Sequence, residues 1–127
     1  MNNPQMKVLI VERNDLIQIQ LKKILTDKKG MVCVRQAYSY KEAVKIFPHY
    51  WPDTVLLDSA LLDGSSLLLL QIFKKLKPDI KVIIMASLPT ATFKKVCLDS
   101  GAADFFEKSN IDHLFLAKIA KRSDFPN

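Results

Sequence analysis

Two carboxylates stand directly after short apolar runs of this sequence, where they could act on a cation or on a phosphoryl group. Glu12 follows residues 8–11, and Asp58 follows residues 55–57. An unbroken apolar run such as 55–57 is typical of a strand buried on both faces, as in a parallel sheet covered by helices. Open α/β sheets bind their ligands at the carboxyl ends of such strands. Asp58 could belong to a site there, although a single Asp more commonly caps a strand or starts a turn.

The elements that must position these carboxylates alternate along the chain. Five short segments rich in apolar and β-branched residues are predicted to be strands: residues 6–11, 31–35, 55–58, 82–86 and 104–107. Helices are predicted between and after them, because apolar residues there recur at helical spacing. These helices begin near residues 15, 40, 66, 90 and 110 or 112, and the last one ends near residue 122.

Two of these helices carry specific signals at their ends. Asn14 and Asp15 are the candidate caps of the first helix. Ser39, followed three residues later by Glu42, fits a capping box at the start of the second helix. Pro48 is predicted to help end that helix, because proline cannot donate a backbone hydrogen bond.

Five strands that alternate with five helices predict a fold of the α/β class. The usual outcome is a parallel five-stranded sheet with right-handed crossovers and helices on both faces, a flavodoxin-like three-layer sandwich with strand order 2-1-3-4-5. Strands one and three are then neighbours, so Glu12 and Asp58 are expected at the same edge of the sheet. Their proximity would suit a cation site or a phosphoryl-transfer site. A Walker loop and a GxGxxG motif are absent, which argues against nucleotide binding by those routes.

The composition narrows the function classes. A chain of 127 residues with 49% apolar and 25% charged residues is typical of one globular domain. No apolar run approaches the length of a membrane span, and residues 1–5 lack the apolar core of a secretory signal, so we expect a cytoplasmic protein. Cys33 and Cys97 lie far apart without histidine-rich neighbours, which favours free thiols over a zinc site.

The net charge of +6 raises the question of nucleic-acid binding. The lysines come as pairs on separate segments, which is more typical of solvated helix faces, so we expect no direct contact with nucleic acid. We expect residues 1–5 to be disordered, residues 6–122 to form the domain, and residues 123–127 to be a frayed tail or the start of a linker.

Four segments together resemble the receiver domain of bacterial two-component response regulators, over residues 6–122. They are VLIVE at 8–12, PDTVLLD at 52–58, LDGS at 62–65 and GAADFFEKS at 101–109. The resemblance implies that Asp58 accepts a phosphoryl group from a histidine kinase or phosphotransfer protein and that Lys108 contacts the phosphoryl oxygens. It also implies a Mg²⁺ ion held by Glu12, Asp58 and the backbone carbonyl of Ala60. Such a domain turns over no separate substrate, relays a signal by a conformational change, and can form a homodimer.

One departure from the family pattern affects the expected metal site. Arg13 stands where the family usually has an Asp that contacts the metal. Two like unit charges ~4 Å apart repel by about 4 kcal/mol at an effective dielectric of ~20, so Arg13 should weaken Mg²⁺ binding. The site would keep its metal if Arg13 turned to solvent or if Asp15 reached in. Alternatively, Arg13 could replace the metal and pair with Asp58 or with a phosphoryl group, which its planar fork suits.

Other departures concern the residues that would sense phosphorylation. Ala86 aligns with the hydroxyl residue of the family, and Ser87 follows one position late, so Ser87 would face the site only if the strand end bulges. Phe105 occupies the position of the aromatic switch residue but lacks a hydroxyl. Ser109 replaces the proline that commonly follows Lys108, so no cis peptide bond is expected there.

Three functions remain open at this point. Asp58 and Lys108 favour a phosphoryl-accepting receiver, whereas Arg13 and Ala86 favour a degenerate receiver that acts as a phosphorylation-independent interaction module. A small flavin-binding electron carrier would share the fold. It would need a phosphate-binding loop rich in Ser, Thr and Gly after the first strand, and residues 12–15 do not form one.

Overall fold

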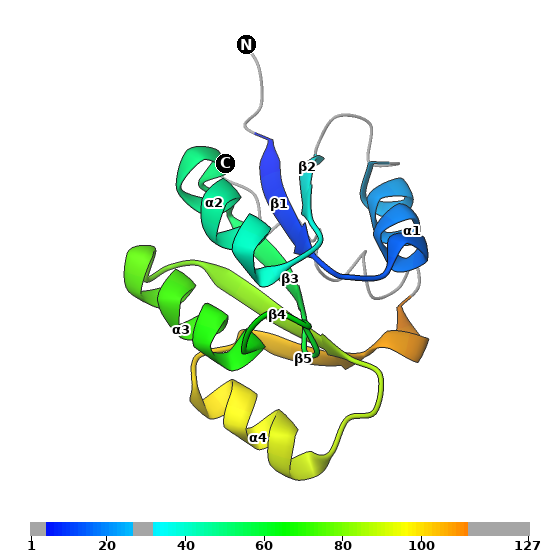
Figure 1. Cartoon of the computed structure of the whole chain (residues 1–127), viewed down its shortest axis with the longest axis vertical. Helices are drawn as coiled ribbons and strands as arrows, with labels where there is room; N and C mark the ends of the chain where they lie inside the picture. The colour runs from blue at the N-terminus through cyan, green and yellow to red at the C-terminus, as the bar shows by residue number, and fades with distance from the viewer. Residues whose placement is uncertain (1–4, 27–31, 112–127) are drawn as a thin grey trace.

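A single parallel sheet with the strand order β2-β1-β3-β4-β5 forms the centre of the computed structural model, which describes residues 5–26 and 32–111 (Figure 1). The predicted flavodoxin-like order is therefore confirmed. The strands are β1 (Met6–Val11), β2 (Val32–Ala37), β3 (Thr54–Asp58), β4 (Lys81–Ala86) and β5 (Asp104–Glu107). The helices are α1 (Asp15–Thr26), α2 (Tyr40–Tyr50), α3 (Ser66–Leu76), α4 (Ala91–Asp99) and the short 3-10 helix η1 (Lys108–Asn110). The predicted last helix and residues 123–127 lie outside the described residues.

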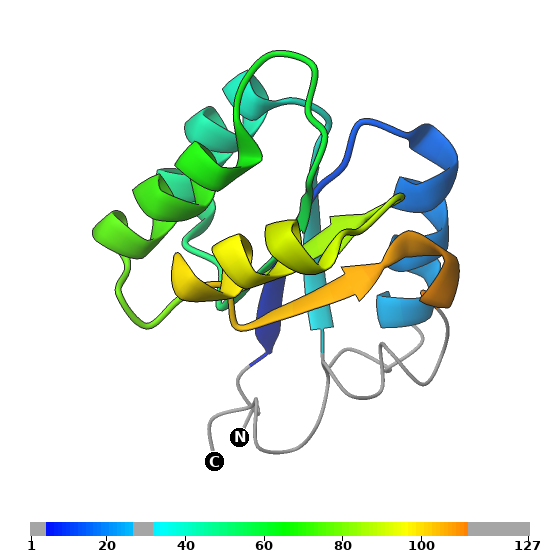
Figure 2. The same ribbon diagram turned by 90° about the horizontal axis from the view of Figure 1, so that it is seen from below.

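The helices cover both faces of the sheet, which explains the unbroken apolar strands. In β1, Val8 packs into a core cluster with Leu21 of α1, whereas Leu9 packs into a second cluster with Phe47 of α2 and Phe73 of α3. Figure 2 shows α1 across the sheet from α2 and α3. The rings of Phe47 and Phe73 stack with centroids 4.1 Å apart, which joins the latter two helices. No helix in the described part of the chain is long and apolar enough to cross a membrane.

The register of the sheet brings the ends of β1, β3, β4 and β5 to one edge. Val11 of β1 pairs with Leu57 of β3, so the residues that follow them, Glu12 and Asp58, are neighbours. Ala86 at the end of β4 pairs with Glu107 at the end of β5. Lys108, the next residue after β5, therefore starts η1 at the same carboxyl edge.

Most predicted boundaries agree with the structure, and the cap signals explain why. The Asn14 side chain accepts hydrogen bonds from the amides of Leu16 (2.9 Å) and Ile17 (3.1 Å), so Asn14 caps α1 and Asp15 is the first helical residue. The Ser39 hydroxyl accepts from the Glu42 amide at 3.1 Å. The predicted capping box differs in its return bond, because the Glu42 carboxylate accepts from the amide of residue 38 rather than from that of Ser39.

The prediction that Pro48 helps to end the second helix is wrong. Helix α2 continues to Tyr50, with Pro48 inside its last turn. A proline there removes only one hydrogen bond, and the turn is completed by the Trp51 amide, which donates to the Phe47 carbonyl at 2.8 Å. The helix ends instead because Trp51 adopts a left-handed conformation, with φ of 53°.

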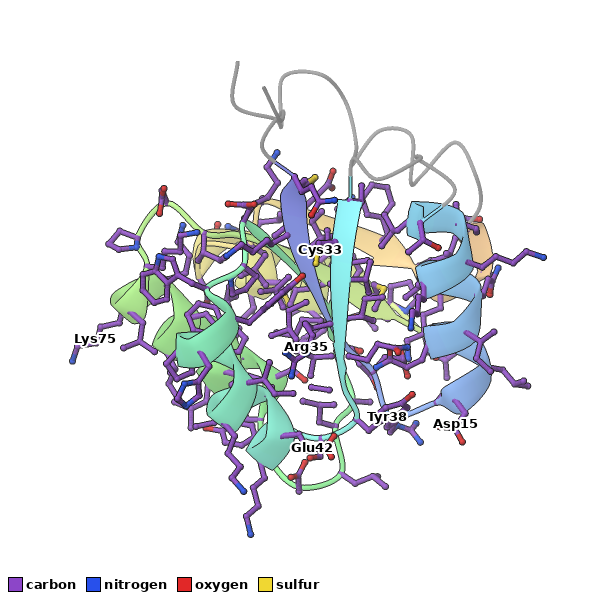
Figure 3. All side chains as sticks on the ribbon, turned by 90° about the horizontal axis from the view of Figure 1, so that it is seen from above. Asp15, Cys33, Arg35, Tyr38, Glu42 and Lys75 are labelled. Carbon is purple, nitrogen blue, oxygen red and sulfur yellow. The ribbon has the colours of Figure 1, made fainter. Side chains whose placement is uncertain are left out.

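Strand β2 extends two residues beyond its predicted end. Gln36 and Ala37 continue the register against Ile10 and Val11 of β1. Figure 3 shows Cys33 and Tyr38 near opposite ends of β2, with Tyr38 at the carboxyl end. The predicted strand stops before Gln36 because Gln36 is polar. The structure accommodates this polar side chain, because it donates a hydrogen bond to the buried side chain of Gln18 in α1.

Candidate functional site

Lys108 joins the two carboxylates predicted from the strand ends. Its Nζ atom lies 3.0 Å from Oδ1 of Asp58 and 2.8 Å from Oε1 of Glu12. Both carboxylates have no exposed surface, and the Lys108 side chain is only 10% exposed. The expectation that Glu12 and Asp58 share one edge of the sheet is confirmed. An ammonium ion between two buried carboxylates offsets part of their desolvation and mutual repulsion.

Backbone groups orient the Asp58 carboxylate. The Ala60 amide donates to Oδ1 at 2.9 Å, which is the local turn contact expected of an Asp at a strand end. The Ser66 hydroxyl, at the start of α3, donates to the Asp58 carbonyl oxygen. Asp58 therefore closes its own turn and also contacts two cationic side chains, Lys108 and Arg13. Ala60 lies beside the carboxylate with its amide hydrogen directed towards it.

Burial raises the pKa of Glu12 above its ordinary value of 4.5, and the nearby Asp58 charge acts in the same direction. The Lys108 ammonium group and the amide of Asn14, which donates to Oε2 at 2.9 Å, partly oppose this increase. Glu12 therefore makes an ion pair through one oxygen and a backbone hydrogen bond through the other.

Arg13 adds a fourth charged side chain to Glu12, Asp58 and Lys108. Its Nε atom lies 3.7 Å from Oδ2 of Asp58, and its backbone amide nitrogen lies 3.5 Å from the same oxygen. The side chain is 46% exposed, so it pairs with Asp58 while keeping contact with solvent. Asp15 is exposed in the first turn of α1, and its carboxylate pairs with none of the pocket side chains that the structure describes.

The residues of this pocket fit a magnesium ion poorly. Glu12 and Asp58 supply two negative charges, and Lys108 and Arg13 supply two positive charges. Magnesium sites in proteins are built from carboxylates and other oxygen ligands with a surplus of negative charge. Among the described residues, no group of three or more His, Cys, Asp or Glu side chains could hold a metal ion. Oδ2 of Asp58, one of the oxygens that a metal ion could use, faces Arg13.

Gln18 is a buried positioning residue that the sequence analysis missed. Its Nε2 atom contacts the carbonyl oxygens of Ala37 (2.8 Å), Glu12 (3.1 Å) and Ile10 (3.2 Å), and its Oε1 atom accepts from the Gln36 side chain at 3.0 Å. Gln18 thus connects the carboxyl ends of β1 and β2 by hydrogen bonds, next to the backbone of Glu12. A signal existed, because Gln18 lies three residues before the buried Leu21 on the apolar face of α1.

Asp63, in the loop between β3 and α3, contacts the start of α2. Its carboxylate accepts from the amides of Tyr40 (2.8 Å) and Lys41 (3.1 Å) at the start of α2. These backbone hydrogen bonds lower the pKa of Asp63 below its ordinary value, and the bond from Lys41 has the largest effect. The neighbouring Gly64 lies against Tyr40, and a Cβ atom there would come within 2.5 Å of the ring. The loop after Asp58 is therefore attached to α2.

The residues expected to sense phosphorylation lie at the end of β4, in the bend after it, and on β5. Strand β4 is regular to its end, where Ala86 is 3% exposed, and Ser87 follows in an exposed bend. The strand has no bulge there that would turn Ser87 towards Asp58. Phe105 is buried, and its ring meets that of Phe93 in α4 edge-on, with centroids 5.8 Å apart. The peptide bond between Lys108 and Ser109 is trans, as expected.

Comparison with known proteins identifies what this arrangement resembles. A family model described as the response regulator receiver domain matches residues 8–120. Response regulator GacA of Pseudomonas syringae pv. syringae is 31% identical over 102 residues, which cover 80% of this chain and 48% of that protein. Chemotaxis protein CheY of Thermotoga maritima is 26% identical over 102 residues, which cover 80% of this chain and 84% of that protein. The chain spans about half the length of the GacA proteins it matches.

A solved structure shows the same fold. The signal receiver domain of a DNA-binding response regulator from Colwellia psychrerythraea 34H superposes with a TM-score of 0.85 at 21% identity, over 91% of this chain and 95% of that one.

Proposed function

Because the chain belongs to the response regulator receiver domain family, we propose that it accepts a phosphoryl group on Asp58 from a histidine kinase or phosphotransfer protein and relays the signal by a conformational change. The observation that carries this proposal is the position of Lys108, whose ammonium group contacts the buried carboxylate of Asp58. Receiver domains are not themselves enzymes in the usual sense. Receiver domains generally bind Mg²⁺ at an acidic pocket. The main departure of this chain from that pattern is that Arg13 and Lys108 balance the two carboxylates.

The contacts of Asp58 favour Oδ2 as the attacking atom. Oδ1 is engaged by the Ala60 amide and by Lys108 at 2.9 and 3.0 Å, whereas the nearest donors to Oδ2 are the more distant groups of Arg13. In the transfer, a bond forms between Oδ2 and phosphorus while the bond from phosphorus to the donor's imidazole nitrogen breaks. The electron pair of that bond stays on the imidazole nitrogen. Lys108 would stabilise charge on the phosphoryl oxygens.

The proposed route of the signal starts at Lys108. A phosphoryl group would draw its ammonium group away from Glu12, and Lys108 directly follows β5. Phe105, on the same strand, packs against Phe93 of α4, so a shift of β5 would reach that helix. Ser87 remains the proposed hydroxyl donor in place of Ala86. This role would require the exposed bend after β4 to move towards Asp58 once the phosphoryl group is present.

A second candidate function is a phosphorylation-independent interaction module. The observation that favours it is that Asp58 is fully buried and already contacts both Lys108 and Arg13. A buried carboxylate that is already paired with two cations is hindered as a nucleophile, so the domain would act without phosphorylation. Such a domain would present one constant surface to its partner.

Intact-mass spectrometry after incubation with acetyl phosphate tests the proposal. We expect one phosphoryl adduct on the wild-type protein and none on Asp58→Asn. Asp99→Asn is the matched control, because Asp99 is exposed on α4 and pairs only with Lys95 of the same helix among the described residues. An adduct that survives in Asp58→Asn would contradict the assignment. No adduct on the folded wild type, either from acetyl phosphate or from its kinase, would favour the interaction module.

A further inference from the structure

The four charges of the pocket sum to zero with no metal ion present. Glu12 and Asp58 are paired with Lys108, and Asp58 is also paired with Arg13. Resting on the proposed function, we propose that the Arg13 guanidinium takes the place of a divalent cation in this chain, so that phosphoryl transfer to Asp58 proceeds without Mg²⁺. The proposal follows from the poor fit between the pocket and a metal ion.

Each oxygen of Asp58 has its own cationic neighbour. The ammonium group of Lys108 contacts Oδ1. The Nε atom and the backbone amide of Arg13 both face Oδ2. A phosphoryl group bonded to Oδ2 would emerge beside the guanidinium. The planar fork of arginine can bind two phosphoryl oxygens at once and stays charged at every working pH. Arg13 is therefore placed to neutralise the group that arrives as well as the carboxylate that receives it.

The charge balance favours the guanidinium over a metal ion. A divalent cation added to the neutral cluster would leave a surplus of two positive charges next to Oδ2 of Asp58. The ion and Arg13 would also compete for that oxygen. Phosphorylation, in contrast, adds about one negative charge to a cluster that already holds two cations.

The half-exposed Arg13 side chain defines the competing outcome. With 46% of its surface in solvent, it could turn away and leave Oδ2 to a metal ion. The two arrangements predict opposite effects of removing Mg²⁺ and of removing the guanidinium. Variants at Arg13 therefore decide between them.

The experiment measures phosphoryl adducts from acetyl phosphate by intact mass, in excess Mg²⁺ and in EDTA. We expect the wild type to form the adduct at the same rate in both. Arg13→Gln should lose about 100-fold in EDTA, the loss typical of removing one group that stabilises developing charge. Lys22→Gln is the matched control, since it removes a positive charge from an exposed position of α1, and it should behave as the wild type.

A second readout does not depend on transfer. Replacing the guanidinium with a carboxylate in Arg13→Asp should create a metal site, so its melting temperature should rise with MgCl₂ concentration while that of the wild type stays constant. An adduct on the wild type that requires Mg²⁺ would overturn the inference and leave the proposed function intact. Loss of the adduct in the folded wild type under every condition would overturn both. An Arg13→Gln rate in EDTA equal to the wild-type rate would show that Arg13 supplies nothing.

Discussion

Lys108 and Asp58 are separated by 50 positions in the chain, and their side chains meet at 3.0 Å inside the protein. The parallel order β3-β4-β5 creates this contact, because it brings the ends of β3 and β5 to one edge of the sheet. The ammonium group also holds Glu12, so one side chain compensates two buried carboxylates. The stability and the proposed chemistry of the pocket consequently depend on the same residue.

Removing the Lys108 ammonium group should destabilise the fold. Lys108→Ala would leave two neighbouring buried carboxylates without their shared cation, and breaking a buried pair in this way costs roughly 3–5 kcal/mol. Urea denaturation measures the loss in the free energy of unfolding. Lys95→Ala is the control, because its exposed pair with Asp99 contributes at most about 0.5 kcal/mol. Equal losses in the two variants would argue against a stabilising role for the buried cluster.

The stability of the protein should depend on pH through Glu12. Because burial raises the pKa of Glu12 above 4.5, the folded protein binds more protons than the unfolded chain between 4.5 and the raised value. This contribution to stability is fully present below 4.5 and is lost as the pH rises through that window. Glu12→Gln removes this pH dependence. The unfolding free energy of the wild type should therefore fall relative to that of the variant as the pH rises through the window. Urea titrations at a series of pH values give both curves, and parallel curves would contradict the assignment.

Gln18 should matter more than any other glutamine of α1. Gln18→Met keeps the length of the side chain but leaves buried carbonyl groups at the ends of β1 and β2 without their donor, at a cost of roughly 1–3 kcal/mol. Gln20→Met, on the same helix, loses only one long hydrogen bond, to the Ile111 carbonyl at 3.4 Å, and should lower the unfolding free energy less than Gln18→Met does. Chemical denaturation of the two variants provides the comparison. A tolerant Gln18→Met would mean that ordered water takes over the carbonyl groups.

Gly64 should resist enlargement because of Tyr40. A methyl group at Gly64 would approach the Tyr40 ring to 2.5 Å, so Gly64→Ala should destabilise the protein by about 1–3 kcal/mol. Combining it with Tyr40→Ala should remove most of this penalty, which a double-mutant cycle measures as a coupling energy. Independent, additive effects would show that the loop after β3 does not press on α2.

The sequence by itself determined the class of fold and the two carboxylates of the site. Unbroken apolar strands, helical spacing and the cap residues Asn14 and Ser39 are local features, and local features are sufficient when they all favour one architecture. Boundaries failed where a local signal was ambiguous. Pro48 is compatible with the last turn of a helix as well as with its end, and Gln36 is polar although it belongs to β2.

The tertiary structure decided how the charges of the site are arranged. The sequence left Arg13 with two alternatives, solvent or Asp58, and the structure combines them in a half-exposed side chain that reaches the carboxylate. It also assigned Gln18 and Asp63 to contacts with elements distant in the chain. Such contacts depend on the register between strands and on which groups lose their water. Both are set only when the sheet and its helices pack, and neither is encoded in the spacing of residues along one segment.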